Sequence, residues 1–204
     1  MKKKYLGLIM IIIGVLIVGG ALAMRFYGIQ KQNNMIKNYE QALEEMDKTK
    51  DKTKDGDSTD DSDYNPDLAA PTLDIEGTIG IIKIPKIDLK VAIGDGVDMD
   101  TLKYAVGHYT DSVYPGDVGN CSIAGHRSYT YSEYFNRLDE VEIGDEILIV
   151  TSNGEFTYKV YDKFIVEPEE TWVLDDSKDS ELTLITCTPV RSATHRLIIK
   201  GKLE

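Results

Sequence analysis

An uninterrupted apolar run near the N-terminus constrains this chain more than any other feature. Residues 5 to 23, YLGLIMIIIGVLIVGGALA, carry no charged side chain, and three lysines stand directly before them. Such a run forms a helix of about 28 Å, close to the roughly 30 Å thickness of a bilayer's hydrocarbon core. The preceding lysines favour a cytoplasmic N-terminus. The sequence therefore predicts a single-pass cell-membrane anchor, with the rest of the chain extracellular.

A cleaved signal peptide is the alternative interpretation of the same segment. The motif ALA at residues 21 to 23 resembles a signal-peptidase site. The apolar run is, however, longer than the roughly 7–15 residues usual in the apolar region of a signal peptide. Its length therefore favours an uncleaved anchor. Both interpretations place everything after Met24 outside the cytoplasm.

The composition after the apolar run predicts a spacer and then a folded domain. Residues 47 to 71 are almost all charged or small and polar, which leaves too little apolar surface to bury. The segment MIKNYEQALEEM before them is able to form a helix. We expect a tail at residues 1–4, a transmembrane helix at 5–24, a flexible extracellular stalk at 25–71 reaching about 40 Å, and a folded domain at 72–204.

The net charge of -12 argues against a nucleic-acid partner, since binding phosphates requires clustered lysine and arginine. The segment from residue 73 onward instead has the pattern of short strands separated by turns. Strands are indicated at residues 87–93, 121–125, 182–187 and 196–203, and a hairpin at 145–166 around Asn153-Gly154. Only the segments MDTLKYAVG and YSEYFNRLDEV are helix-like. We therefore expect a mainly β domain, a closed or nearly closed barrel with short helices.

A cysteine and a histidine follow two of these strands and form a candidate nucleophile and base. Cys187 ends the strand LTLIT, and His126 follows the strand SIAG, where Gly125 is expected to permit an unusual backbone angle. If the two strands are parallel neighbours, their C-terminal ends meet and the thiol and imidazole share one edge. A thiolate attacks carbonyl groups and needs a proton acceptor, which is usually histidine.

An arginine completes the candidate site. Arg196 begins the strand that returns from the loop after Cys187, so its guanidinium is expected beside the thiol, where it can stabilise an oxyanion. Arg191, within the loop, and Arg127 are weaker candidates, and Arg127 is expected to point away from the site. The two remaining histidines, His108 and His195, are interpreted as structural.

A disulfide between the two cysteines is the competing interpretation in an exported chain. Cys121 lies five residues before His126 in the same expected strand, which is roughly 16 Å along it. A disulfide requires Cα atoms about 4.4–6.8 Å apart. The catalytic pair and the disulfide therefore exclude each other. The disulfide would make the chain a non-catalytic β-domain acting in adhesion.

The quoted motifs resemble the sortases, the membrane-anchored cysteine transpeptidases of Gram-positive bacterial surfaces. TLITC at residues 183–187 matches the TLxTC signature of that family, and IGIIKIPKIDLKVAI, NCSIAGHRS and HRLIIKGKL extend the resemblance over nearly all of residues 76 to 203. The resemblance implies an eight-stranded barrel with Cys187 as nucleophile, His126 as acid/base and Arg196 as the active-site arginine. NCSIAGHRS and the single N-terminal anchor are similar to class D, and TCTP and HRLIIKG to the pilus-building class C, our second choice.

The resemblance also implies a substrate and partners. The expected substrate is a surface protein with an LPxTG-like sorting motif, cleaved between threonine and glycine through a thioacyl-enzyme. The acceptor is the amine of a cell-wall precursor or a pilin lysine. Thr186, Trp172 and Val173 are expected to contact the bound peptide, and no cofactor or metal is expected. A mainly hydrolytic cysteine peptidase is the alternative with the same chemistry.

Overall fold

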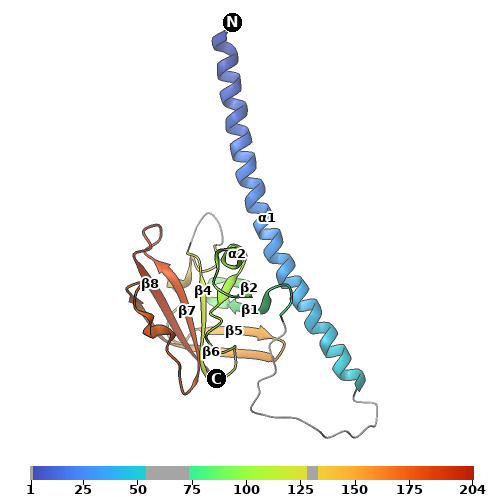
Figure 1. The fold of residues 1–204 in the computed structure, drawn as a ribbon, viewed down its shortest axis with the longest axis vertical. Coiled ribbons are helices and arrows are strands. Elements are labelled where there is room, and N and C mark those ends of the chain that lie inside the picture. The colour runs from blue at the N-terminus through green and yellow to red at the C-terminus, as the bar shows by residue number, and fades with distance from the viewer. Residues whose placement is uncertain (1, 54–73, 128–132) are drawn as a thin grey trace.

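The folded domain is a closed barrel of eight strands, and one long helix precedes it (Figure 1). The computed structural model describes residues 2–53, 74–127 and 133–204. The strand order around the barrel is β1-β2-β3-β4-β7-β8-β6-β5. This confirms the expected barrel. The strands are β1 Thr78–Ile84, β2 Leu89–Asp95, β3 Val106–His108, β4 Gly119–Gly125, β5 Glu146–Thr151, β6 Gly154–Val166, β7 Ser180–Thr188 and β8 His195–Leu203.

Alternating side chains fill the barrel and cover part of its outside. In β7, Leu182 and Leu184 belong to the main core inside the barrel, whereas Ile185 packs in a separate outer cluster with Val173 and Ile198. This follows from the period of two in a strand, which turns neighbouring side chains to opposite faces. We call the group around Ile185, Ile198 and Val173 the outer cluster.

The helix α1, Lys2–Thr53, is continuous and packs on the outside of β1 and β2 (Figure 1). Tyr39 of α1 is fully buried, and its hydroxyl donates to the carbonyl of Ile79 at 2.7 Å and accepts from the N–H of Ser152 at 3.1 Å. The prediction of a flexible coil is therefore wrong for residues 25 to 53. Apolar residues within the polar segment, Ile36 and Tyr39, give α1 a face that the barrel buries. Residues 54–73, the rest of the predicted stalk, lie outside the described residues.

The short helices differ in part from the sequence expectation. Asp98 caps α2, Met99–Leu102, by accepting from the N–H groups of Asp100 and Thr101. The predicted helix at YSEYFNRLDEV is wrong for its described part, which forms turns and the single 3-10 turn η2, Leu138–Glu140. Two further 3-10 turns are η1, Pro85–Ile87, and η3, Thr171–Leu174.

Candidate active site

Strand pairing brings the predicted site residues to one rim of the barrel. β4 and β7 are parallel neighbours in which Gly125 pairs with Thr186, which meets the condition set for the catalytic pair from the sequence. β8 returns antiparallel to β7 and pairs Arg196 directly with Cys187. His126 and Cys187 therefore each follow one partner of the Gly125–Thr186 pair, and Arg196 lies across from Cys187 on β8.

Cys187 and Arg196 also share a face of the sheet. Ala124, Ile185 and Ile198 pair across β4, β7 and β8 and all belong to the outer cluster. Each candidate lies two positions nearer the rim on its own chain segment. Because side chains two apart in a strand point the same way, Cys187 and Arg196 lie on the outer face. His126 follows the end of β4, and its side chain lines the cavity beside α1.

The two cysteines are both free thiols, which overturns the disulfide alternative. Cys121 pairs with Leu182 in the middle of the barrel, five residues before Cys187 in β7, and only 1% of its surface is exposed. Burial raises the pKa of the Cys121 thiol. Cys187 is half-buried at the rim. Of the two thiols, only Cys187 is therefore open to a substrate.

Tyr109 is a site residue that the sequence reasoning missed. It directly follows β3, where its N–H donates to the carbonyl of Ser122 at 2.9 Å, and it packs against the outer cluster. Burial raises the pKa of the Tyr109 phenol, the positive charge of Arg196 lowers it, and Cys187 raises it further. The phenol is therefore neutral at physiological pH and close to both groups. Its place after His108 gives no sequence signal, because only the strand order brings β3 beside β4.

Arg127 was expected to point away from His126, and its guanidinium contacts the end of β7 next to Cys187. Its guanidinium donates to the Thr188 hydroxyl at 2.8 Å and to the Asn136 carbonyl at 3.3 Å, and pairs with Asp139 at 2.8 Å. Thr188 is the residue after Cys187. The side chain of Arg127 is 7% exposed, so these bonds tie the chain after His126 to the end of β7.

Gly125 and Thr186 serve packing in ways the sequence did not indicate. Gly125 has no left-handed backbone angle, contrary to expectation. Its role is space, since a Cβ there would lie 2.5 Å from the ring of Phe135. Thr186 is 2% exposed and its hydroxyl donates to the carbonyl of Gly125 at 2.7 Å. Thr186 therefore joins the ends of β4 and β7, and its contact with a bound peptide stays a prediction.

The other two predicted substrate-binding residues lie in η3, beside the outer cluster. Val173 is 4% exposed and belongs to the cluster. Trp172 stacks on Phe164 with ring centroids 5.5 Å apart, and its indole N–H donates to Glu170 at 2.6 Å. It nevertheless remains 49% exposed. Trp172 thus presents an exposed aromatic surface to solvent, and Val173 packs η3 against the outer cluster.

The remaining histidines and the arginine candidates have distinct surroundings. His108 is fully buried and hydrogen-bonds to the Val113 carbonyl at 3.0 Å, as expected of a structural residue. His195 faces Glu167 at 3.1 Å.

The two arginine candidates near the β7–β8 loop also differ. Arg196 donates to the carbonyls of Ala193 and its neighbour His195, and Arg191 is exposed within the loop. The guanidinium of Arg196 is therefore held at the start of β8.

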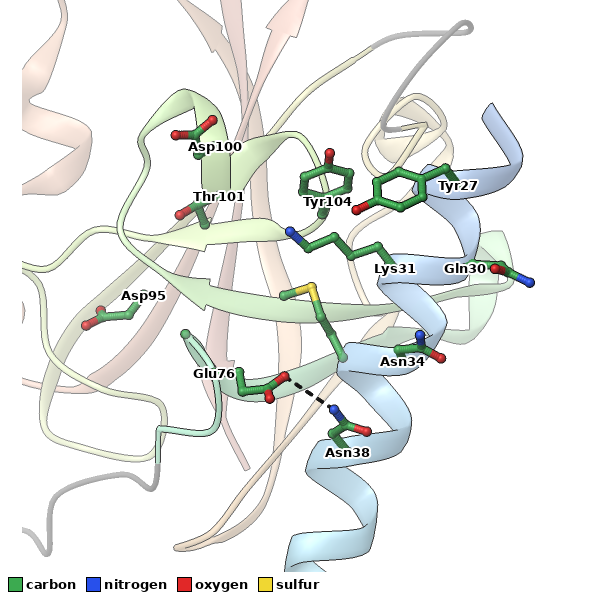
Figure 2. A pocket seen from close by; sticks show the side chains of 12 residues that line it. Tyr27, Gln30, Lys31, Asn34, Asn38, Glu76, Asp95, Asp100, Thr101 and Tyr104 are labelled. Carbon is green, nitrogen blue, oxygen red and sulfur yellow. Dashed lines mark hydrogen bonds between the residues drawn. The ribbon is translucent and has the colours of Figure 1, made fainter. Parts of the chain in front are cut away.

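Two cavities follow the seam between α1 and the barrel. The larger has a volume of about 1170 Å³ and is lined by His126 together with Met24, Arg25 and Leu89 among others. The smaller, of about 580 Å³, lies further along α1. Figure 2 shows Lys31 and Asn38 of α1 turned into it, with the hydrogen bond from Asn38 to Glu76 dashed. Neither cavity is lined by Cys187.

The fold and the rim together define the class of protein: a β-barrel domain behind an apolar N-terminal helix, with a free cysteine centred among basic side chains. Residues 82–204, more than half of the chain, match the family described as the sortase domain. The chain therefore belongs to the sortase family, a family of cysteine transpeptidases. In the described part of the chain, α1 is long and apolar enough to cross a membrane, which fits the membrane anchoring of that family.

Individual relatives agree with this assignment. Sortase D of Bacillus subtilis is 40% identical over 127 residues, which cover 60% of this chain and 62% of that protein. This similarity fits the class D-like interpretation, and this match spans somewhat less than two thirds of that relative. Sortase A of Bacillus anthracis is 28% identical over 99% of this chain and 96% of its own length. A solved structure of a Clostridium perfringens sortase D5 transpeptidase superposes with a TM-score of 0.58 at 36% identity, covering 62% of this chain and 79% of that one.

Proposed function

We propose that this chain is a sortase that cleaves an LPxTG-like sorting motif between threonine and glycine and joins the freed carbonyl to an amine. The register that places Cys187 opposite Arg196, one position beyond the Gly125–Thr186 pair, carries the proposal. Family membership supports it independently. The acceptor amine belongs to a cell-wall precursor, in keeping with the similarity to class D-like relatives.

The chemistry follows from the three side chains. The thiolate of Cys187 attacks the threonine carbonyl, and the negative charge that develops on the carbonyl oxygen is stabilised by Arg196. His126 gives a proton to the departing glycine amine, which leaves a thioester on Cys187. The acceptor amine then attacks the thioester, His126 takes the amine's proton, and an amide forms as the thiolate of Cys187 is released.

The proposed domain layout adds membrane topology to the fold. Residues 1–4 form a cytoplasmic tail and residues 5–24 span the membrane. Residues 25–71 connect the spanning segment to the catalytic domain, residues 72–204, on the outer surface. Exposed apolar side chains between Ile9 and Phe26 support the spanning segment, since the barrel leaves them without a partner.

A competition between an amine and water tests the proposal. The full chain in detergent receives a sorting peptide and a short peptide with a free amino-terminus, and the products are separated and weighed by mass spectrometry. We expect an amide-linked product that the Cys187→Ala variant does not form. A product cleaved only to the free acid, even at saturating amine, would instead identify a hydrolytic cysteine peptidase.

A further inference from the structure

The way α1 packs on the barrel fixes where the catalytic rim stands relative to the membrane. Ile36 and Tyr39 are buried against the barrel, and Lys90 of β2 pairs with Glu40 at 2.8 Å. Arg25, the first charged residue after the apolar run, pairs with Glu133 at 2.9 Å. The membrane-proximal and the distal parts of α1 are thus both attached to the domain. The helix is therefore a rigid connection to the membrane segment, which we call the strut, and not a flexible linker.

The height of each contact along α1 gives the orientation of the barrel. His126 lines a cavity whose α1 wall runs from Ala23 to Gln32, so the catalytic rim lies beside the part of α1 that directly follows the apolar run. Tyr39 contacts Ser152, in the turn between β5 and β6 at the other end of the barrel. The 14 residues from Arg25 to Tyr39 span about 21 Å of helix, which is about the length of the barrel strands. Figure 1 shows the same arrangement, with the rim toward the N-terminal part of α1 and the C-terminus at the far end.

From this geometry we propose that the catalytic rim faces the lipid surface and lies within the membrane's interfacial layer. This rests on the proposed function only in that α1 spans the membrane. The loop between β7 and β8 and the cavity that His126 lines then open toward the bilayer.

The single tryptophan of the chain allows a direct test. Trp172→Phe removes it and gives a silent background. Ser192→Trp places a probe at an exposed position of the β7–β8 loop, and Val118→Trp places one at an exposed position before β4, at the opposite end of the barrel. Each full-length protein is reconstituted into phosphatidylcholine vesicles that contain a lipid with a nitroxide on its headgroup, and tryptophan quenching is measured.

We expect quenching of the Ser192→Trp probe to be at least about threefold stronger than that of the Val118→Trp probe, since a strand length of roughly 20 Å separates them. An eight-residue Gly-Ser insertion after Met24 uncouples the membrane segment from the docked part of α1, and it should abolish this difference. The same insertion after residue 60 is the matched control and should preserve it.

The outcomes separate the two proposals. Flotation of the vesicles on a density gradient reports whether the chain inserts at all, and failure to float would overturn the membrane anchor in the proposed function. A chain that floats but quenches both probes equally, or quenches the Val118→Trp probe more, would overturn the proposed orientation while leaving the anchor in place. Unequal quenching that survives the insertion after Met24 would also overturn the strut, because the barrel would then be held by its own surface.

Discussion

The two cysteines differ in environment enough to be distinguished chemically. Burial raises the pKa of Cys121, so this thiol stays protonated in the folded chain as the pH rises through the range where an ordinary thiol ionises. Thiolates alone react with iodoacetamide. We predict that the native protein takes up one equivalent of reagent, at Cys187, between pH 7 and about pH 9, and a second only after denaturation. Peptide mapping checks this, and native labelling of Cys121 would contradict the burial.

The guanidinium of Arg196 should matter far more than that of its loop neighbour. Arg196→Gln removes the charge paired across from Cys187, and the loss of an oxyanion donor commonly costs about 2.7–4 kcal/mol, or roughly 100- to 1000-fold in rate. Arg191→Gln changes an exposed side chain in the loop and serves as the matched control. Steady-state kinetics with a sorting peptide should show the loss in kcat for the first variant only. Equal effects of the two would remove Arg196 from the mechanism.

At the scale of the strands, the packing of the end of β4 against Phe135 requires a residue without a side chain at position 125. A Cβ at Gly125 would lie 2.5 Å from Phe135, so Gly125→Ala must push the ring or the strand end aside. Overpacking of this kind costs about 1–3 kcal/mol, and it should also lower activity by displacing His126. Thermal unfolding and kinetics on the same samples measure both effects.

The double variant Gly125→Ala/Phe135→Leu provides the control for that clash. A smaller side chain at position 135 leaves room for the new methyl group. We expect the double variant to recover part of the activity that Gly125→Ala loses, even though Phe135→Leu alone is destabilising. If the losses of activity in the two single variants simply add in the double variant, the end of β4 is not held by the contact between Gly125 and Phe135.

At the scale of the whole molecule, Tyr39 joins α1 to the β1–β5 side of the barrel, at the end opposite the catalytic rim. Tyr39→Phe leaves the carbonyl of Ile79 and the N–H of Ser152 without this partner, at about 1–3 kcal/mol for buried polar groups. We predict faster amide exchange in residues 29–45 of α1, with β7 and β8 unchanged. Glu40→Gln, at an exposed ion pair, should have little effect. Faster exchange throughout the barrel would show that α1 is part of the folding unit instead.

How much the sequence predicts differs between these scales. Strands with clear apolar alternation, such as those ending at Ala124 and Cys187, were recognised. Their parallel pairing was a condition for the catalytic pair rather than a prediction, and the structure meets it. The strands β1 and β3 and the continuous α1 were not identified as such. The docking of α1 depends on a few apolar residues in a polar segment and on a tyrosine hydroxyl that finds backbone partners 40 and 113 residues away.

The site was predicted where it depends on local position and missed where it depends on packing. Cys187, His126 and Arg196 each stand next to a strand end, and pairing alone brings such residues together. Tyr109 and Arg127 reach the rim through side-chain directions and a strand order that one sequence does not reveal. Thr186 stands in the motif beside the nucleophile, and alternation turns its side chain inward to Gly125, a structural role that its place in the motif does not reveal.

One measurement tests directly whether this rim performs acyl transfer through Cys187. The protein is mixed with an LPxTG-like peptide in the absence of an acceptor amine, quenched in acid, and examined by intact mass spectrometry and peptide mapping. We predict a mass gain equal to the peptide up to its threonine, located on the peptide that contains Cys187, and none in Cys187→Ala. Two results would contradict it. One is an acyl group on a residue other than Cys187. The other is cleavage of the peptide that leaves Cys187 unmodified and is undiminished in Cys187→Ala.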